Sequence, residues 1–130
     1  MRTKFESSRE GFSKALVRFQ EILQEKKTDI VRDSAIKRFE MAFDLAWKTV
    51  KAFLEEYHNT SCVSPRVCFR EAFRLGLIDY DEYWIQICQL RNDTVHTYNE
   101  ALAEKIYAEL PRVHLAFQKL AAAIDTASKG

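Results

Sequence analysis

The sequence predicts an all-α fold, an antiparallel four-helix up-and-down bundle with one extra short helix. Only three glycines and two prolines occur among its 130 residues, fewer turn formers than an all-β fold requires. Apolar residues make up 47% of the chain and recur at intervals of three, four and seven, as in helices that pack in a bundle. At this length, residues 1–130 are expected to form a single domain.

The first two helices are predicted from their apolar repeats. One amphipathic helix is expected over residues 6–25, where apolar residues recur every three or four positions from Phe12 onward. The second, residues 29–57, has a seam that repeats every seven positions: Ile36, Phe43, Val50 and Tyr57, with Phe39, Ala46 and Phe53 interleaved. This spacing assigns its aromatic residues, Trp47 included, to the core rather than to base stacking.

A short third helix and a longer fourth helix are expected next. Ser64 followed by Pro65 is typical of a helix start, and Gly76 of a helix end, so a helix over residues 65–75 is predicted. Asp79 or Asp81 is expected to cap the fourth helix, residues 81–95.

The last helix is predicted from a final apolar series: Ile106, Leu110, Val113, Phe117, Leu120 and Ile124. Pro111 falls inside this series. Because proline lacks a backbone N–H and crowds the preceding turn, a kink or brief break is expected near Leu110.

The formal charge is nearly balanced, with 20 basic and 19 acidic residues, so no long-range field draws the chain to a polyanion. Any contact with nucleic acid is therefore expected to be local. The amino-terminal residues MRTKFESSREGF carry charges where a signal peptide is apolar, and no run of about 18 apolar residues occurs. We expect a cytoplasmic protein that does not enter a membrane.

The chain contains three cysteines, Cys62, Cys68 and Cys88. An odd number without a C-x-x-C pair, and without histidine at ligand spacing, argues against both a disulfide framework and a zinc site. We therefore expect reduced, structural thiols, no metal and no cofactor.

One arginine stands where an apolar residue is expected. On an ideal helix that turns about 100° per residue, Arg91 lies at the centre of an apolar arc that includes Trp84 and Cys88. A guanidinium there is costly unless it is paired. An ion pair with Asp44 or Glu40 of the second helix is one explanation for its position.

His96 lies on a different face of the fourth helix, which it shares with Asn92. An unbroken helix therefore cannot direct Arg91 and His96 to one point. Either the helix ends around residues 94–95, or two copies of the chain meet across a two-fold axis and assemble the site together. We favour the second arrangement, with some local unwinding and with the fourth helix along the dimer face.

The segment LRNDTVHTY, residues 90–98, contains the pattern R-x4-H-x-Y and resembles the signature of HEPN (higher eukaryotes and prokaryotes nucleotide-binding) ribonucleases. The likeness covers residues 36–111. It includes RFEMAFDLAWKTVKAFLEEY (38–57), SPRVCFREAFRLGLID (64–79), Trp84 and IYAELP (106–111). Together these segments are similar to the nucleotidyltransferase substrate-binding, or HepT-like, branch of that superfamily.

The resemblance implies a helical bundle, usually a homodimer, that pairs with a minimal nucleotidyltransferase. In some such pairs the helical member is a ribonuclease toxin of a type VII-like toxin–antitoxin system, and its partner neutralises it by transferring AMP to the motif tyrosine. Carried over to this chain, Arg91 and His96 are the catalytic pair and Asn92 is the polar residue beside them. Tyr98 is then the AMP acceptor.

The motif side chains suit metal-independent RNA cleavage. A histidine can take the proton of the attacking 2′-hydroxyl, and an arginine can stabilise charge on the phosphate oxygens. Asp93 counts against this activity, because it places a carboxylate inside the motif. Three arginines spaced by four along the short helix are candidate phosphate contacts, or else a solvated face relieved by Glu71: Arg66, Arg70 and Arg74.

Three functions are compatible with these observations. The first is a dimeric endoribonuclease toxin. The second is a non-catalytic nucleotidyltransferase substrate-binding or docking subunit, whose cleft near Arg91 and His96 holds a nucleotide. The third is an interaction module that binds another helical protein, because a fold alone does not determine function.

Overall fold

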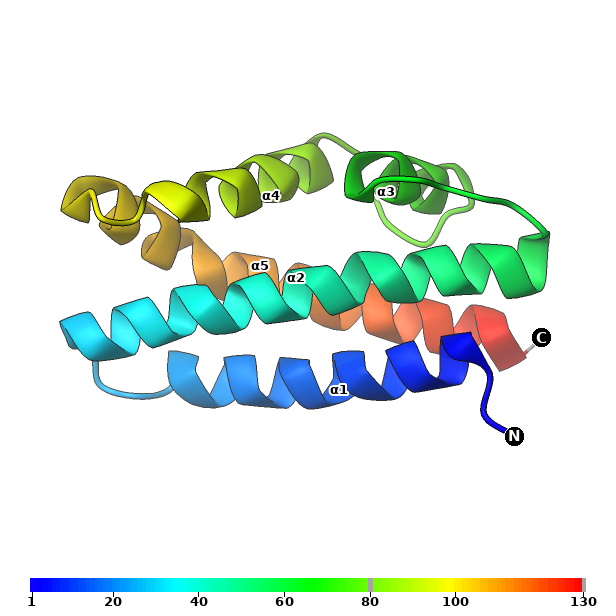
Figure 1. Cartoon of the computed structure of the whole chain (residues 1–130), viewed down its shortest axis with the longest axis horizontal. Helices are drawn as coiled ribbons and strands as arrows, with labels where there is room; N and C mark the ends of the chain where they lie inside the picture. The colour runs from blue at the N-terminus through cyan, green and yellow to red at the C-terminus, as the bar shows by residue number, and fades with distance from the viewer. Residues whose placement is uncertain (80, 130) are drawn as a thin grey trace.

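Helices make up nearly all of residues 1–79 and 81–129, which the computed structural model describes (Figure 1). In chain order they are α1 (Lys4–Leu23), α2 (Asp29–His58), α3 (Pro65–Arg74), α4 (Asp81–Asp93), the 3₁₀ turn η1 (Thr94–His96) and α5 (Glu100–Lys129). The predicted all-α class and the helical bundle are confirmed.

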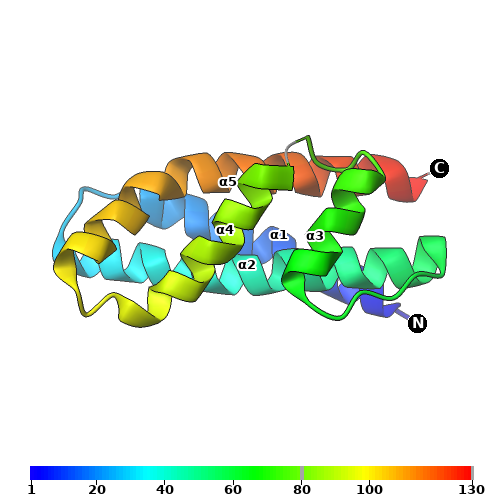
Figure 2. The ribbon, with the colours of Figure 1, turned by 90° about the horizontal axis from the view of Figure 1, so that it is seen from above.

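The bundle has four sides, one of which is shared by two helices. In Figures 1 and 2, α1, α2 and α5 run along the long axis, while α3 and α4 follow one another across the top of α2 and α5. Both chain termini lie at one end, and the segment after α4 lies at the opposite end. The short α3 is therefore part of the fourth side rather than an addition to four long helices.

Side-chain caps define where the helices begin. Thr3 and Glu6 form a reciprocal capping box, with both N–H···O distances near 3 Å (3.0 and 3.1 Å), so α1 starts two residues earlier than its apolar repeat suggests. These hydrogen bonds lower the pKa of Glu6. Ser64 caps α3 as predicted, with Pro65 in the first turn. The proposed capping of α4 by Asp79 or Asp81 concerns residue 80 and the side chain of Asp81, which lie outside the described residues.

The predicted seam of α2 forms the centre of the core. Its interior residues are almost completely buried: Ile36, Phe39, Phe43, Ala46, Val50 and Phe53. Tyr57 and Trp47 depart from full burial: Tyr57 is largely exposed near the end of α2, and Trp47 packs against the core from its edge. Phe39 stacks on Phe117 of α5 with ring centroids 6.3 Å apart, which joins opposite sides of the bundle.

Pro111 bends α5 without breaking it. The helix is continuous from Glu100 to Lys129, so the predicted brief break does not occur. Figure 2 shows that the first turns of α5 (orange) run at an angle to the rest of the helix. Pro111 is exposed, so the hydrogen bond it cannot donate is lost on the solvent side, where water can replace it.

The expectation of three reduced cysteines is wrong. Cys62 and Cys68 form a disulfide, with Cα atoms 5.2 Å apart. The turn that starts α3 at Ser64 folds the preceding segment back beside the first turn of the helix, which brings the two thiols together despite the absence of a C-x-x-C pair. Cys88 is free and buried, and burial raises its pKa to about 11.

Candidate functional site

The motif residues occupy the junction between α4 and α5. The α-helical geometry of α4 ends at Asp93, and Thr94–His96 form one 3₁₀ turn. Asn99 then caps α5, because its side-chain oxygen accepts a hydrogen bond from the backbone of Leu102 at 3.0 Å. The chain therefore unwinds within the motif, as one of the two predicted arrangements requires.

Arg91 turns toward α2. Its guanidinium lies near two carboxylates of that helix, with Nη1 4.0 Å from Glu40 Oε2 and Nε 3.9 Å from Asp44 Oδ1. Nη1 also donates a hydrogen bond to Thr94 Oγ1 at 3.1 Å. The side chain is 26% exposed. The predicted pairing of Arg91 with Glu40 and Asp44 is confirmed, so two acidic side chains compensate its charge within one chain.

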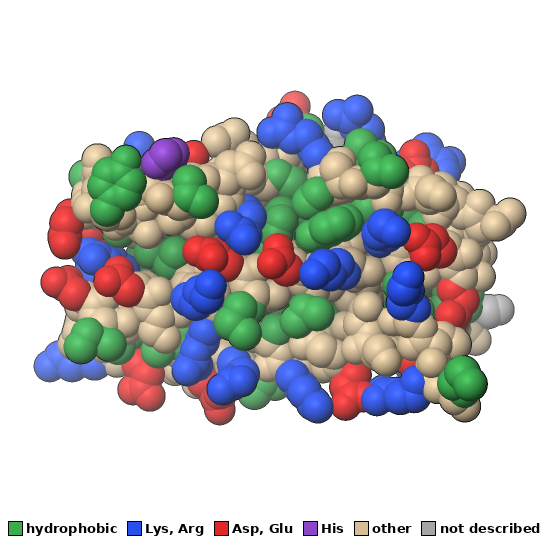
Figure 3. Space-filling model, viewed as in Figure 1, with side chains coloured by type: hydrophobic (Ala, Val, Ile, Leu, Met, Phe, Trp, Pro, Cys, Tyr) green, Lys and Arg blue, Asp and Glu red, His purple; other side chains and the backbone are tan. Residues whose placement is uncertain are grey.

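His96 and Tyr98 stand together in solvent. The Tyr98 hydroxyl is 3.5 Å from His96 Nδ1, and the two rings meet edge to face with centroids 5.9 Å apart. Tyr98 is 83% exposed, so its oxygen is accessible in the single chain, as predicted. Figure 3 shows a histidine (purple) beside apolar side chains at the end of the molecule where Figure 1 places this segment.

Arg91 and His96 have different partners in the single chain. Within the described residues no hydrogen bond joins the two side chains: Arg91 contacts α2 and Thr94, whereas His96 contacts Tyr98. Asn92 is exposed. Asp93 accepts a hydrogen bond from Gln89 at 3.0 Å, which orients its carboxylate along the outer face of α4.

The arginine stripe lies on α3, the helix before the one that carries Arg91. Its members Arg66, Arg70 and Arg74 are all exposed. The three arginines lie on α3, whereas Arg91 lies in the last turn of α4. Arg74 is held by Glu71, with an Nε–Oε2 distance of 2.9 Å, so the structure favours the solvated, locally paired interpretation for this one arginine.

Two further structural findings concern metal binding and membranes. Among residues 1–79 and 81–129, no group of three or more His, Cys, Asp or Glu side chains is placed to hold a metal ion. None of the helices in this part of the chain combines the length and apolar character needed to cross a membrane.

A family model described as "nucleotidyltransferase substrate binding protein like" matches residues 7–126. The chain belongs to this family. The chain is also 34% identical over 89 residues to a protein named probable ribonuclease HepT from Haemophilus influenzae. That alignment spans 62% of this chain and 61% of the relative's length.

Two solved structures resemble this member of the nucleotidyltransferase substrate-binding family. A protein from Thermus thermophilus shares 32% identity with a TM-score of 0.83, over 87% of this chain and 98% of that one. A Haemophilus influenzae protein, whose structure is described as revealing the fold of a substrate binding domain of a nucleotidyltransferase, matches with a TM-score of 0.68 and 22% identity. The match covers 93% of this chain and 96% of that one, and at this identity it shows the fold.

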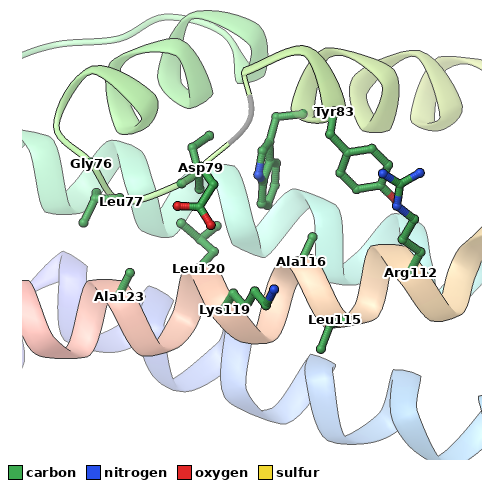
Figure 4. A pocket seen from close by; sticks show the side chains of 12 residues that line it. Gly76, Leu77, Asp79, Tyr83, Arg112, Leu115, Ala116, Lys119, Leu120 and Ala123 are labelled. Carbon is green, nitrogen blue, oxygen red and sulfur yellow. The ribbon is translucent and has the colours of Figure 1, made fainter.

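This family member has a groove that does not include the motif. A groove of about 440 Å³ lies between the loop that follows α3 and the outer face of α5 (Figure 4), and none of residues 91–98 lines it. At one end the Arg112 guanidinium lies 4.0 Å from the centre of the Tyr83 ring, and Tyr83 donates a hydrogen bond to Glu109 at 3.2 Å. Burial and the nearby Glu109 carboxylate raise the pKa of Tyr83.

Sequence reasoning missed two side chains that support the motif. Thr94 is buried, and its hydroxyl both accepts from the Arg91 side chain and donates to the Arg91 carbonyl. Arg32 is buried at the start of α2, where it binds Asp33 at 3.0 Å and Glu100 at 3.3 Å, so it fixes the first turn of α5 two residues after Tyr98. The available signals were a hydroxyl three positions after Arg91 and acidic residues beside Arg32.

Proposed function

We propose that this chain is the HepT-like toxin of a type VII-like toxin–antitoxin pair. It acts as a metal-independent endoribonuclease in the cytoplasm, works as a homodimer, and has a minimal nucleotidyltransferase as its partner. The observation that carries the proposal is the exposure of His96 and Tyr98, 3.5 Å apart, directly after an anchored Arg91. The family and the relative named probable ribonuclease HepT support it.

The proposed reaction uses the RNA's own 2′-hydroxyl. His96 takes the proton of that hydroxyl, and its oxygen forms a bond to the adjacent phosphorus as the bond to the 5′-oxygen breaks. The leaving 5′-oxygen takes a proton from solvent, so the products carry a 2′,3′-cyclic phosphate and a 5′-hydroxyl. Arg91 stabilises the charge on the phosphate oxygens, and the Asn92 amide assists at the same phosphate.

The homodimer supplies the geometry that one chain lacks. Because Arg91 faces α2 and His96 faces solvent, a two-fold axis close to the end of α4 would place the histidine of one copy near the arginine of the other. The exposed arginines of α3 are then further RNA contacts: Arg66, Arg70 and Arg74.

Tyr98 is the proposed site at which the partner silences the enzyme. Its oxygen attacks the α-phosphorus of ATP, pyrophosphate leaves, and the phenolic proton passes to solvent. Since this oxygen is 3.5 Å from His96 Nδ1, the added phosphodiester would lie against the imidazole. It would then occupy the space that the scissile phosphate of RNA needs.

The test is cleavage of RNA by the chain purified without its partner. We expect the wild type to leave 2′,3′-cyclic phosphate ends and His96→Ala to lose at least about 100-fold in rate. The matched control is His58→Ala, which removes an exposed histidine at the end of α2 and is expected to retain activity. Intact RNA with the wild type, or equal cleavage by His96→Ala, contradicts the proposal.

A second function rests on a different observation. Glu40 and Asp44 already compensate the charge of Arg91, which suits a subunit that holds a nucleotide loosely for the nucleotidyltransferase and performs no chemistry itself. In that case a nucleotide raises the melting temperature of the chain, and the chain co-purifies with a nucleotidyltransferase encoded beside it, while RNA stays intact. The absence of both effects excludes this docking function.

A further inference from the structure

The motif arginine is engaged from its own turn of the chain. Thr94, three positions after Arg91, donates its hydroxyl proton to the Arg91 carbonyl at 2.7 Å and accepts a hydrogen bond from Nη1 at 3.1 Å. Thr94 is only 4% exposed, so this hydroxyl has little access to water. One buried hydroxyl thus joins the backbone of Arg91 to its own guanidinium at the point where α4 changes to a 3₁₀ turn.

Two carboxylates of α2 also lie near the same guanidinium. Glu40 and Asp44 are four positions apart, so they lie on one face of α2. Their oxygens are 4.0 Å from Nη1 and 3.9 Å from Nε, respectively. Lys37 shares the Glu40 carboxylate, with its Nζ 3.7 Å from Oε2. Asp44 has no such competitor among the ion pairs of the described residues.

The Nε group of Arg91 is buried and has no hydrogen-bond partner within the described chain. A buried N–H of a charged group is costly when it is left unpaired. Asp44 Oδ1, at 3.9 Å, is the acceptor that a shift of about 1 Å would bring to hydrogen-bond distance. The Asp44 side chain is 46% exposed and free to make that shift.

We propose that Asp44, together with Glu40 and Thr94, positions the Arg91 guanidinium for the phosphate. This inference rests on the proposed ribonuclease function. Arginine has five N–H donors in a rigid fork, so holding Nε and Nη1 against α2 and Thr94 presents the remaining donors to an anion in one orientation. Without these supports the flexible side chain samples several rotamers, and part of the rate that depends on orientation is lost.

The kinetic test compares two substitutions of Asp44. Asp44→Asn keeps the size of the side chain and removes its charge, and we expect kcat for RNA cleavage to fall about tenfold while KM changes by less than about threefold. Asp44→Glu, which keeps the charge and reaches farther, restores kcat to within about threefold of the wild type. The matched control is Glu55→Gln, which removes a carboxylate of α2 that pairs with Lys51.

A second substitution series addresses the hydroxyl. Thr94→Val has nearly the same shape without the hydroxyl, whereas Thr94→Ser retains it. Thr94→Val is expected to lower kcat about tenfold and Thr94→Ser to leave it near the wild-type value, with melting temperatures recorded for both. A kcat for Asp44→Asn and Thr94→Val equal to or above the wild type overturns the inference, as does an equal loss in Glu55→Gln.

An independent measurement does not require catalysis. In the NMR spectrum of wild-type protein, the Arg91 Nε–H signal is expected to exchange slowly with water. In Asp44→Asn it is expected to move and to exchange at least about fivefold faster. The Arg9 Nε–H signal, held by Asp125 at 2.7 Å, is the internal control. If the wild type cleaves no RNA, the proposed ribonuclease function is wrong, but the Arg91 Nε–H signal still tests whether Asp44 positions the guanidinium. An Arg91 signal unaltered in Asp44→Asn overturns the positioning.

Discussion

Arg32 and Arg91 both face carboxylates at the motif end of the bundle, yet their surroundings differ in the completeness of their partners. The Arg32 side chain is 4% exposed and donates hydrogen bonds at 3.0 and 3.3 Å to Asp33 and Glu100, with Asp29 and Glu104 also within 4 Å (3.7 and 3.8 Å). Arg91 is 26% exposed, its carboxylates lie at 3.9 and 4.0 Å, and its Nε lacks a hydrogen-bond partner among the described residues.

The difference separates a structural arginine from one that can accept a ligand. Arg32 has four carboxylates within 4 Å, donates hydrogen bonds through Nε and Nη1, and joins the first turn of α2 to the first turn of α5. Arg91 is oriented but incompletely satisfied, so an anion that approaches it gains hydrogen bonds which the protein does not already supply. Perturbing each arginine should therefore affect different properties of the molecule.

The largest expected effect is on activity. Arg91→Met should lower the rate of RNA cleavage by about 10²–10³, because the charge on the phosphate oxygens then lacks its guanidinium. Arg18→Met, which removes an exposed arginine of α1, is the control and should cleave RNA at the wild-type rate. Single-turnover experiments measure both cleavage rates. Full activity in Arg91→Met would contradict the distinction between a structural Arg32 and an Arg91 that accepts a ligand.

The second effect is on stability. Arg32→Met should lower the melting temperature by about 5–10 °C, because four carboxylates lose the cation between them and α2 loses a link to α5. Arg91→Met should lower it by less than about 2 °C. Thermal unfolding followed by circular dichroism measures both, and a reversed order would contradict the comparison.

A third prediction concerns the helix that carries Arg91. Cys88, one turn before it, is buried in the core, and burial raises its thiol pKa from 9.0 to about 11. Between these two pKa values the folded chain keeps the thiol proton that the unfolded chain releases. The contribution of the protonated thiol to stability is therefore complete below pH 9 and is lost as the pH rises toward 11. We expect the free energy of unfolding to fall by about 2 kcal/mol over that interval. Cys88→Ala should remove this part of the pH dependence, as measured by urea titration.

The smallest expected effect is that of a chelator. Since His96 and Arg91 supply the base and the cation of the proposed reaction, EDTA should change the cleavage rate by less than about twofold. The cleavage rate is measured with and without EDTA. Matched samples of both reactions receive added Mg²⁺ as a control. Complete loss with EDTA and recovery with Mg²⁺ would mean that a metal ion performs one of these roles.

Regular patterns allowed the fold to be predicted, and irregular contacts limited the prediction. The seven-residue repeat of α2 identified its buried seam, and the helical position of Arg91 suggested an ion pair with Asp44 or Glu40, both of which lie near it. The disulfide between Cys62 and Cys68 was missed because it depends on how the segment before α3 folds back. The start of α1 was missed because the capping box of Thr3 precedes the first apolar residue of the repeat.

The candidate site was predictable in composition but not in arrangement. The motif names Arg91, His96 and Tyr98, whereas their directions depend on the change from α-helix to 3₁₀ turn at Thr94. That change follows from hydrogen bonds of the Thr94 hydroxyl and from the capping of α5 by Asn99, which compete with regular helix formation. Helical periodicity carries no information about such contacts.

The availability of Arg91 to an anion is tested most directly by NMR of the arginine side chains during titration with a 2′-deoxy oligonucleotide, which lacks the attacking hydroxyl and cannot be cleaved. The guanidinium signals of Arg91 should shift with saturable dependence on the oligonucleotide, while those of Arg32 stay in place. Signals of Arg91 that remain unchanged at saturating oligonucleotide, or shifts confined to Arg32, would contradict the assignment of Arg91 to the phosphate.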